Sequence, residues 1–144
     1  MNKEVFRLGA LAPLLWLLLT ASEARGRDSR ISVEQLLQTT SSWDGTGYVG
    51  YAAGQPQITV LKIRIPAHTA LDWHRHPMIS AGYVLTGQIV LERRDTGRRK
   101  IFHAGQALGE MVNKVHRGYT TNSPVELIVF YAGTVGVPLS IKAK

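Results

Sequence analysis

The stretch WHRHPMISAGYVLTG, residues 73–87, decides the fold. It places two histidines two positions apart just after one turn, and a short apolar strand pattern follows them. In an extended chain, residues i and i+2 point to the same side, so the imidazoles of His74 and His76 face one way. Residues 83–86, Gly87 and residues 88–93 then have the pattern of a strand, a tight turn and a second strand. The stretch therefore predicts two histidines presented together by β-structure.

Short strand patterns continue on both sides of this stretch. Residues 61–65 (LKIRI) alternate between apolar and basic side chains, the period-2 pattern of a strand with one solvent-exposed face. Residues 95–97 (DTG) predict a turn before a strand at residues 100–103, and the apolar run at residues 125–132 (VELIVFYA) predicts a central strand buried on both sides. Turn signals recur about every 8–12 residues, which is typical of an all-β sandwich or barrel.

Length and composition limit the chemistry. A chain of 144 residues is sufficient for one domain. It contains no cysteine, which excludes disulfides, thiolate metal sites and cysteine nucleophiles. A bound metal must therefore be held by histidine nitrogens and oxygen ligands.

The first 24 residues have the layout of a secretory signal peptide. Lys3 and Arg7 precede an apolar run at residues 8–20, and residues 21–24 (ASEA) supply small side chains at the −3 and −1 positions of a cleavage site. The run is short for a bilayer span and contains Pro13, so an uncleaved anchor is the weaker alternative. We expect a mature chain beginning near Arg25, without a stable membrane anchor, in the bacterial periplasm or the medium.

An N-terminal arm at residues 25–50 is expected to precede a barrel at residues 51–140. Within the arm, Ser32 and Gln35 have the spacing of a capping box. Val33, Leu36 and Leu37 would then form the apolar face of a short helix of about two turns. We expect this helix to lie as a flap over the barrel.

The net charge of +7 favours anionic ligands or surfaces as partners. Nucleic acid is not an expected partner outside the cytoplasm. Five basic residues surround the turn at residues 95–97. We interpret them as a solvated hairpin whose charge keeps its edge from pairing, with an anion-docking patch as the alternative.

The pair His74 and His76 predicts a metal site if its side of the strand is the interior. Buried polar groups need compensation, and two converging imidazoles would find it in a metal ion. A His-x-His pair alone is a weak signal, so the residues around it matter.

The spacing of these residues resembles the two motifs of the cupin superfamily. The first motif falls on His68, His74, His76, Ser80 and Gly87, and the second on Gly105, Met111, Asn113, His116 and Thr120. Five of the ten positions are identical to the motif residues, including three histidines. The resemblance implies a double-stranded β-helix, or jelly-roll barrel, that binds one metal ion through His74, His76 and His116.

Departures from the motifs alter these expectations. His68 and Asn113 replace glycines, and both residue types tolerate positive φ, so the turns are expected to survive. Ser80 replaces the glutamate that is usually the fourth ligand. A centre of three imidazoles with open positions follows, suited to divalent Fe, Zn, Ni or Cu and less suited to manganese.

Further side chains are candidates for the cavity. Glu110, six residues before His116, is predicted to reach it as a ligand, a partner of a ligand or a general base. The alternative is a surface glutamate that pairs with a nearby cation. Tyr83 and Tyr119 are candidates to offer hydroxyls to a substrate, with packing of the barrel as the alternative. His103 is expected to be exposed.

The sequence supports two functional hypotheses. One is a metal enzyme acting on a small organic molecule, by Fe(II) oxygenation or by Lewis-acid isomerisation or hydrolysis. The other is a non-catalytic module that binds or senses a small molecule or a metal. Glu110 pointing inward favours the enzyme. A homodimer is also expected, since small single-barrel cupins often pair and open strand edges favour pairing.

Overall fold

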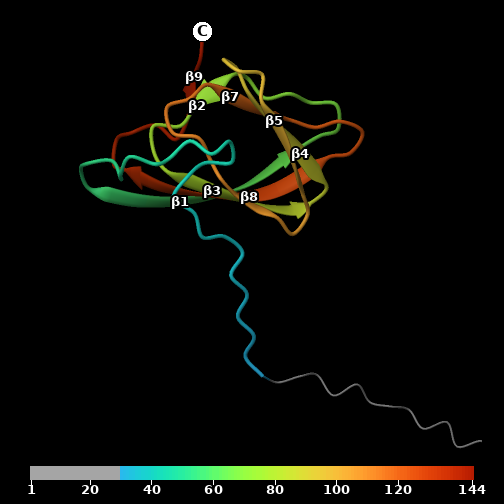
Figure 1. The fold of residues 1–144 in the computed structure, drawn as a ribbon, viewed down its shortest axis with the longest axis horizontal. Coiled ribbons are helices and arrows are strands. Elements are labelled where there is room, and N and C mark those ends of the chain that lie inside the picture. Colours follow the sequence, from blue (N-terminus) through green and yellow to red (C-terminus); the bar gives the residue numbers. More distant parts are fainter. Residues whose placement is uncertain (1–29) are drawn as a thin grey trace, which may run out of the picture. The chain divides into compact units, whose positions relative to one another are not determined.

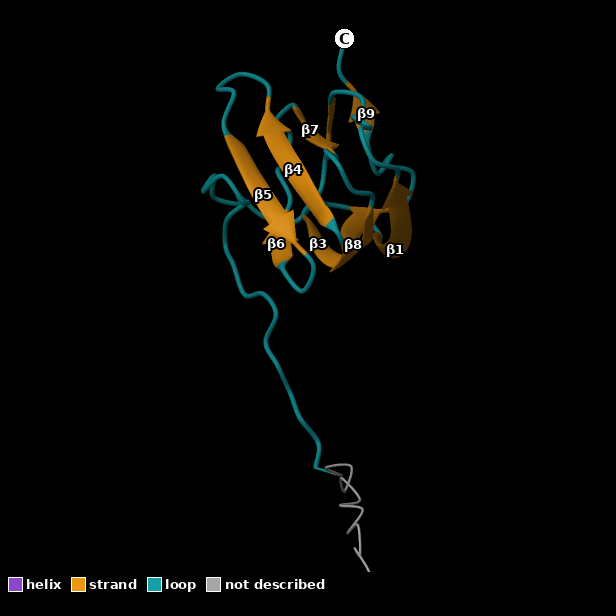
Figure 2. Cartoon of the chain, turned by 90° about the vertical axis from the view of Figure 1, so that its right-hand side faces the viewer, coloured by secondary structure: helices purple, strands orange, loops and turns teal. Residues whose placement is uncertain are grey.

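The computed structural model describes residues 30–144, and this part of the chain is built from strands without a helix (Figure 2). Residues 34–144 form one compact unit that holds every strand. Residues 30–33 hold neither helix nor strand. The strands are β1 (Pro56–Ile65), β2 (His74–Arg75), β3 (Ser80–Thr86), β4 (Gln88–Arg93), β5 (Arg99–His103), β6 (Ala107–Gly109), β7 (His116–Tyr119), β8 (Val125–Thr134) and β9 (Ile141–Lys142).

The strands form two antiparallel sheets, which confirms the all-β prediction. One sheet has the order β1-β8-β3-β6 and the other β5-β4-β7-β2-β9. Figure 1 shows β1, β3 and β8 in one layer and β2, β7 and β9 in the other. Apolar side chains between the two sheets form a single core; its most buried members are Met78, Val84, Leu91, Leu108, Met111 and Val125.

The strand patterns predicted for β1 and β8 are formed, with one correction. In β1 the side chains of Ile63 and Ile65 face the core, as the alternation predicts. The run in β8 was expected to be buried on both sides, and that expectation is wrong. β8 is central, between β1 and β3, but only alternate residues are buried, and Phe130 is 39% exposed. A two-layer fold covers one face of each sheet and leaves the other to solvent.

Gly87 forms the corner at which the chain crosses from one sheet to the other. β3 ends one residue before it and β4 begins one residue after it, in the opposite sheet. Gly87 has a φ of 74°, and a Cβ there would lie 2.1 Å from the carbonyl oxygen of Pro124. Only glycine fits both requirements.

The two motif positions where glycine is replaced keep the left-handed conformation. His68 has a φ of 53° and Asn113 a φ of 54°. This confirms that both turns survive the substitutions. The Asn113 side chain also accepts a hydrogen bond from Arg75 at 2.9 Å.

The short helix predicted in the arm is not formed. Residues 32–38 have no regular secondary structure, although Ser32 and Gln35 have capping-box spacing. Two turns are too short to be stable in water alone, and the apolar face is only partly covered, since Leu36 is 49% and Leu37 38% exposed. No helix among the described residues is long and apolar enough to cross a membrane. The predicted signal peptide lies outside the described residues.

The end of the arm packs against β6. Residues Ser41 and Gly47 form an isolated antiparallel bridge, and the backbone N–H of Trp43 donates to the Gly109 carbonyl at 2.9 Å. The Tyr48 hydroxyl donates to the Glu110 carbonyl at 2.9 Å. The arm therefore holds the segment that carries Glu110.

Candidate metal centre

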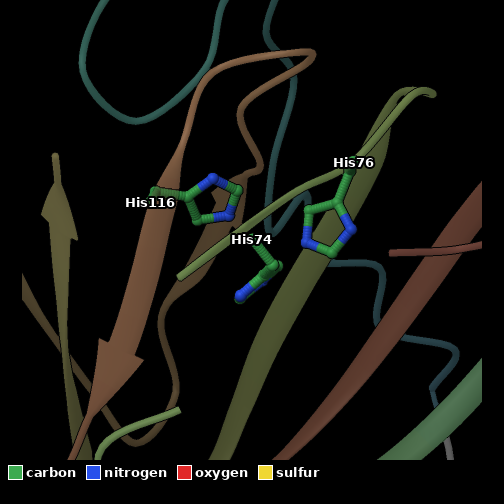
Figure 3. A group of neighbouring side chains, drawn as sticks. All are labelled: His74, His76 and His116. Atoms are coloured by element: carbon green, nitrogen blue, oxygen red, sulfur yellow. The ribbon is translucent and has the colours of Figure 1, made fainter. Parts of the chain in front are cut away.

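His74, His76 and His116 converge from two strands and the turn beside them. His74 and His116 are register partners on β2 and β7, and His76 follows β2. Their ring centroids lie 4.7 to 5.2 Å apart, and Figure 3 shows the three rings facing a common space. The structure thus brings together the three residues proposed as ligands.

Backbone carbonyls orient all three rings in the same way. The Nδ1 atoms of His74, His76 and His116 lie 2.7, 2.7 and 2.8 Å from the carbonyl oxygens of Asp72, Leu139 and Lys114. A carbonyl oxygen only accepts, so each Nδ1 carries the proton and donates. The Nε2 atoms are therefore the ones available to bind a metal, the usual arrangement of metal-binding histidines.

The environment of these nitrogens fits a divalent ion. The three potential ligand atoms all lie within 4.8 Å of one another. Burial lowers the pKa of His74 and His76 below the ordinary value of 6.5, which favours neutral imidazoles. The Nε2 of His116 is buried and has no hydrogen-bond partner. Buried nitrogens without partners are costly, and a metal ion among them would remove that cost.

Glu110 faces this cluster, so the alternative of a surface glutamate is wrong. The residue is only 7% exposed, and its Oε2 lies 3.4 Å from the Nε2 of His116. Burial would raise the pKa of Glu110, but the facing His116 lowers it. Burial would lower the pKa of His116, but the Glu110 carboxylate raises it. Each group stabilises the charged form of the other.

A small apolar cavity adjoins the cluster. Its volume is about 50 Å³, room for a few water-sized groups. Its lining contains neither lysine nor arginine. Besides the three histidines, it is formed by Ile63, Ile65, Leu71, Ile89, Leu91, Glu110, Gly118, Leu127, Val129 and Tyr131.

The predicted tyrosines do not reach the cavity. Tyr83 lies between buried Gly82 and Val84 on β3, so its side chain points to the outer face of the sheet. Tyr119 lies on the outer face of β7, where the guanidinium carbon of Arg117 is 5.7 Å from the centroid of the tyrosine ring. Neither lines the cavity. His103 is exposed, as predicted.

Tyr131 is the tyrosine that lines the cavity, and it is not among the residues predicted from the sequence. It lies on the buried face of β8, with its ring centroid 5.5 Å from that of His76. Burial, with the charge of Glu110, raises its pKa to about 12, so it remains protonated at neutral pH. The sequence pattern could have identified it, because residues 125, 127, 129 and 131 are alternate positions of one strand and therefore share one face.

The sequence match agrees with this geometry. Residues 61–131 match the family model described as "Cupin domain", a range that contains all three histidines. These residues form a cupin domain. The cupin resemblance noted in the sequence is thereby confirmed.

Solved cupin-fold structures are similar to this cupin at low identity. The DMSP lyase DddQ from Ruegeria pomeroyi is 15% identical with a TM-score of 0.53, over 60% of this chain and 43% of that one. The polyketide cyclase RemF from Streptomyces resistomycificus is 17% identical with a TM-score of 0.53, over 63% of each chain. The oxalate decarboxylase from Lactobacillus farciminis is 16% identical with a TM-score of 0.51, over 61% of this chain and 27% of that one.

These likenesses show the fold alone. This cupin spans less than two thirds of the length of each of these enzymes. No curated protein sequence matches it.

Proposed function

We propose that this chain is an exported mononuclear metal-dependent enzyme that acts on a small organic molecule. The observation that carries the proposal is the convergence of three imidazoles and a buried carboxylate on one apolar cavity. A titratable acid in the cavity favours an enzyme over a binding module, because pKa-shifted groups gather where chemistry is done.

Some residues of the site would bind the metal, and others hold the binding residues in position. Divalent Fe, Zn, Ni or Cu bound there would supply Lewis acidity toward a ligand oxygen, and iron would add oxygen chemistry. The carbonyls of Asp72, Leu139 and Lys114 hold the three rings in orientation. Tyr131 stays protonated and can donate a hydrogen bond to an oxygen of the bound molecule.

The lining favours a small substrate with an uncharged, apolar body. Aliphatic side chains form most of the wall, and they exclude water from the reacting atoms. The positive charge of the chain lies elsewhere, so an anionic substrate would depend on the metal for charge compensation. The neighbouring lyase, cyclase and decarboxylase show that one fold serves several reactions, so the fold does not select among them.

Measuring turnover distinguishes the enzyme hypothesis from the hypothesis of a non-catalytic binding module. Protein reconstituted with Fe(II) or Zn(II) is screened against small organic acids, esters and aromatic compounds, and oxygen uptake, hydrolysis and isomerisation are recorded. Turnover that is lost in His76→Ala supports the enzyme. Compounds that raise Tm without being converted by either metal form support the non-catalytic module instead.

Export rests on the N-terminal apolar run and its small-residue cleavage site. Full-length protein is expressed in a Gram-negative host, and the periplasmic fraction is examined by N-terminal sequencing. A chain beginning near Arg25 supports export. Uncleaved protein confined to the cytoplasm contradicts it.

Self-association is the proposed quaternary state. β1 pairs with β8 on one side, and no other strand of the described part pairs with its second edge. Its outward side chains Ile58 and Val60 are exposed beside Phe130. An open strand edge with exposed apolar side chains favours pairing with a second copy. Light scattering that shows a monomer at micromolar concentration contradicts a dimer.

A further inference from the structure

Both main-chain polar groups of Glu110 form hydrogen bonds that fix its position. It follows β6, and its backbone N–H donates to the Ser80 carbonyl of β3 at 2.8 Å. Its own carbonyl accepts the hydrogen bond from Tyr48 at 2.9 Å. The side chain lines the cavity together with the three histidines. A buried carboxylate directed at this cluster is therefore a fixed feature of the fold.

The contact between Glu110 and His116 lacks the geometry of a hydrogen bond. Their Oε2 and Nε2 atoms are 3.4 Å apart, and neither atom has a hydrogen-bond partner. A charge-assisted hydrogen bond would bring them to about 2.7–2.9 Å. Two donors at about 2.1 Å from one tetrahedral ion lie about 3.4 Å apart. The observed separation is that of two ligands of one metal ion.

We propose that Glu110 is the fourth metal ligand, so that the centre has three imidazoles and one carboxylate. The inference rests on the proposed metal site and replaces the expected centre of imidazoles alone. The carboxylate offsets one of the two charges of a divalent ion and adds an oxygen donor. It also widens the range of metals toward harder ions such as manganese.

Ser80 offers a matched way to test this assignment. It lies across from Glu110 between β3 and the end of β6, is 1% exposed, and its Oγ has no hydrogen-bond partner. Its register partner on β8 is Tyr131, which lines the cavity. Register partners share a face, so Ser80 points to the same interior. A carboxylate moved from position 110 to position 80 would therefore enter the same cavity.

The experiment compares Zn(II) affinity and the visible spectrum of bound Co(II) in four proteins. These are the wild type, Glu110→Gln, the double variant Ser80→Glu/Glu110→Ser, and Glu126→Gln as a control on a partly exposed surface glutamate. Affinity is measured by competition with a chromophoric chelator, and circular dichroism confirms folding. The Co(II) spectrum reports the ligands directly, so it separates a ligand from a residue that only orients His116.

Glu110→Gln is expected to weaken Zn(II) binding at least tenfold and to change the Co(II) spectrum. The double variant should recover most of the affinity, and Glu126→Gln should match the wild type. Unchanged affinity and spectrum in Glu110→Gln overturn the assignment while leaving the three-histidine site intact. Failure of the double variant to recover affinity, with folding retained, also contradicts it. Absence of metal binding by the wild type overturns the proposed function itself.

Discussion

The hydroxyl of Tyr48 donates a hydrogen bond to the carbonyl oxygen of Glu110 across 62 residues of sequence. The bond is 2.9 Å long, and burial raises the pKa of Tyr48 to about 12, so the donor keeps its proton. The contact links the arm to the acid of the metal centre. Tyr48 is therefore a positioning residue for Glu110.

Tyr48→Phe removes this hydrogen bond without changing the ring. We expect a loss of about 1 kcal/mol in the free energy of unfolding, measured by urea titration. Zn(II) affinity should fall as well, because Glu110 is held less firmly. Tyr51→Phe is the matched control, since Tyr51 is 80% exposed. Equal urea midpoints and equal affinities in the two variants would contradict this role.

Gly87→Ala should disrupt the corner between the sheets. The new Cβ would meet the backbone of Pro124 at 2.1 Å, and the positive φ adds strain. We expect a loss of about 3 kcal/mol or more in the free energy of unfolding. Gly97→Ala also has a positive φ but meets nothing within 4 Å, so it should lose only about 1–2 kcal/mol. Similar losses in both variants would show that the close approach is unimportant.

Asp44 should make the stability of the arm depend on pH. Burial opposes its ionisation, but hydrogen bonds from Ser42, Thr46 and Arg93 lower its pKa well below the ordinary 3.8. A carboxyl with a lowered folded-state pKa stabilises the protein above the unfolded-state pKa. That stability is lost as the pH falls below about 4 toward the folded-state pKa.

The test compares urea midpoints of the wild type and Asp44→Asn at several pH values. The wild type should be the more stable at pH 7, because the variant loses the 2.7 Å ion pair with Arg93. The difference should shrink as the pH falls from about 4. A difference that stays constant down to pH 2 would show that the charge of Asp44 contributes nothing.

The fold and the three histidines could be predicted because their signals are local. Period-2 alternation marked β1, and the spacing of His74 and His76 placed both rings on one side of the chain. The position of His116 came from the cupin resemblance, and β7 pairs it with His74. Gly87 marked the turn, although its place between two sheets depends on tertiary packing.

The rest of the site depends on contacts between distant segments. Nothing local links Tyr48 to Glu110 or Ser80 to Glu110, because the arm, β3 and β6 meet only in the folded chain. Tyr83 was a wrong choice because the strand alternation that buries Gly82 and Val84 turns it outward. The helix predicted at residues 32–38 is absent for a related reason, since its capping pattern is local but its apolar face is only partly covered by the folded chain.

The metal content of the purified protein shows whether His74, His76 and His116 bind a metal ion. The wild type, His76→Ala and the exposed-histidine control His103→Ala are purified from a bacterial host and analysed by elemental mass spectrometry. We expect about one divalent transition-metal ion per chain in the wild type and in His103→Ala, and its loss in folded His76→Ala. Metal retained by His76→Ala at the wild-type level, or none bound by the wild type after incubation with Fe(II), Zn(II), Ni(II) or Cu(II), would contradict it.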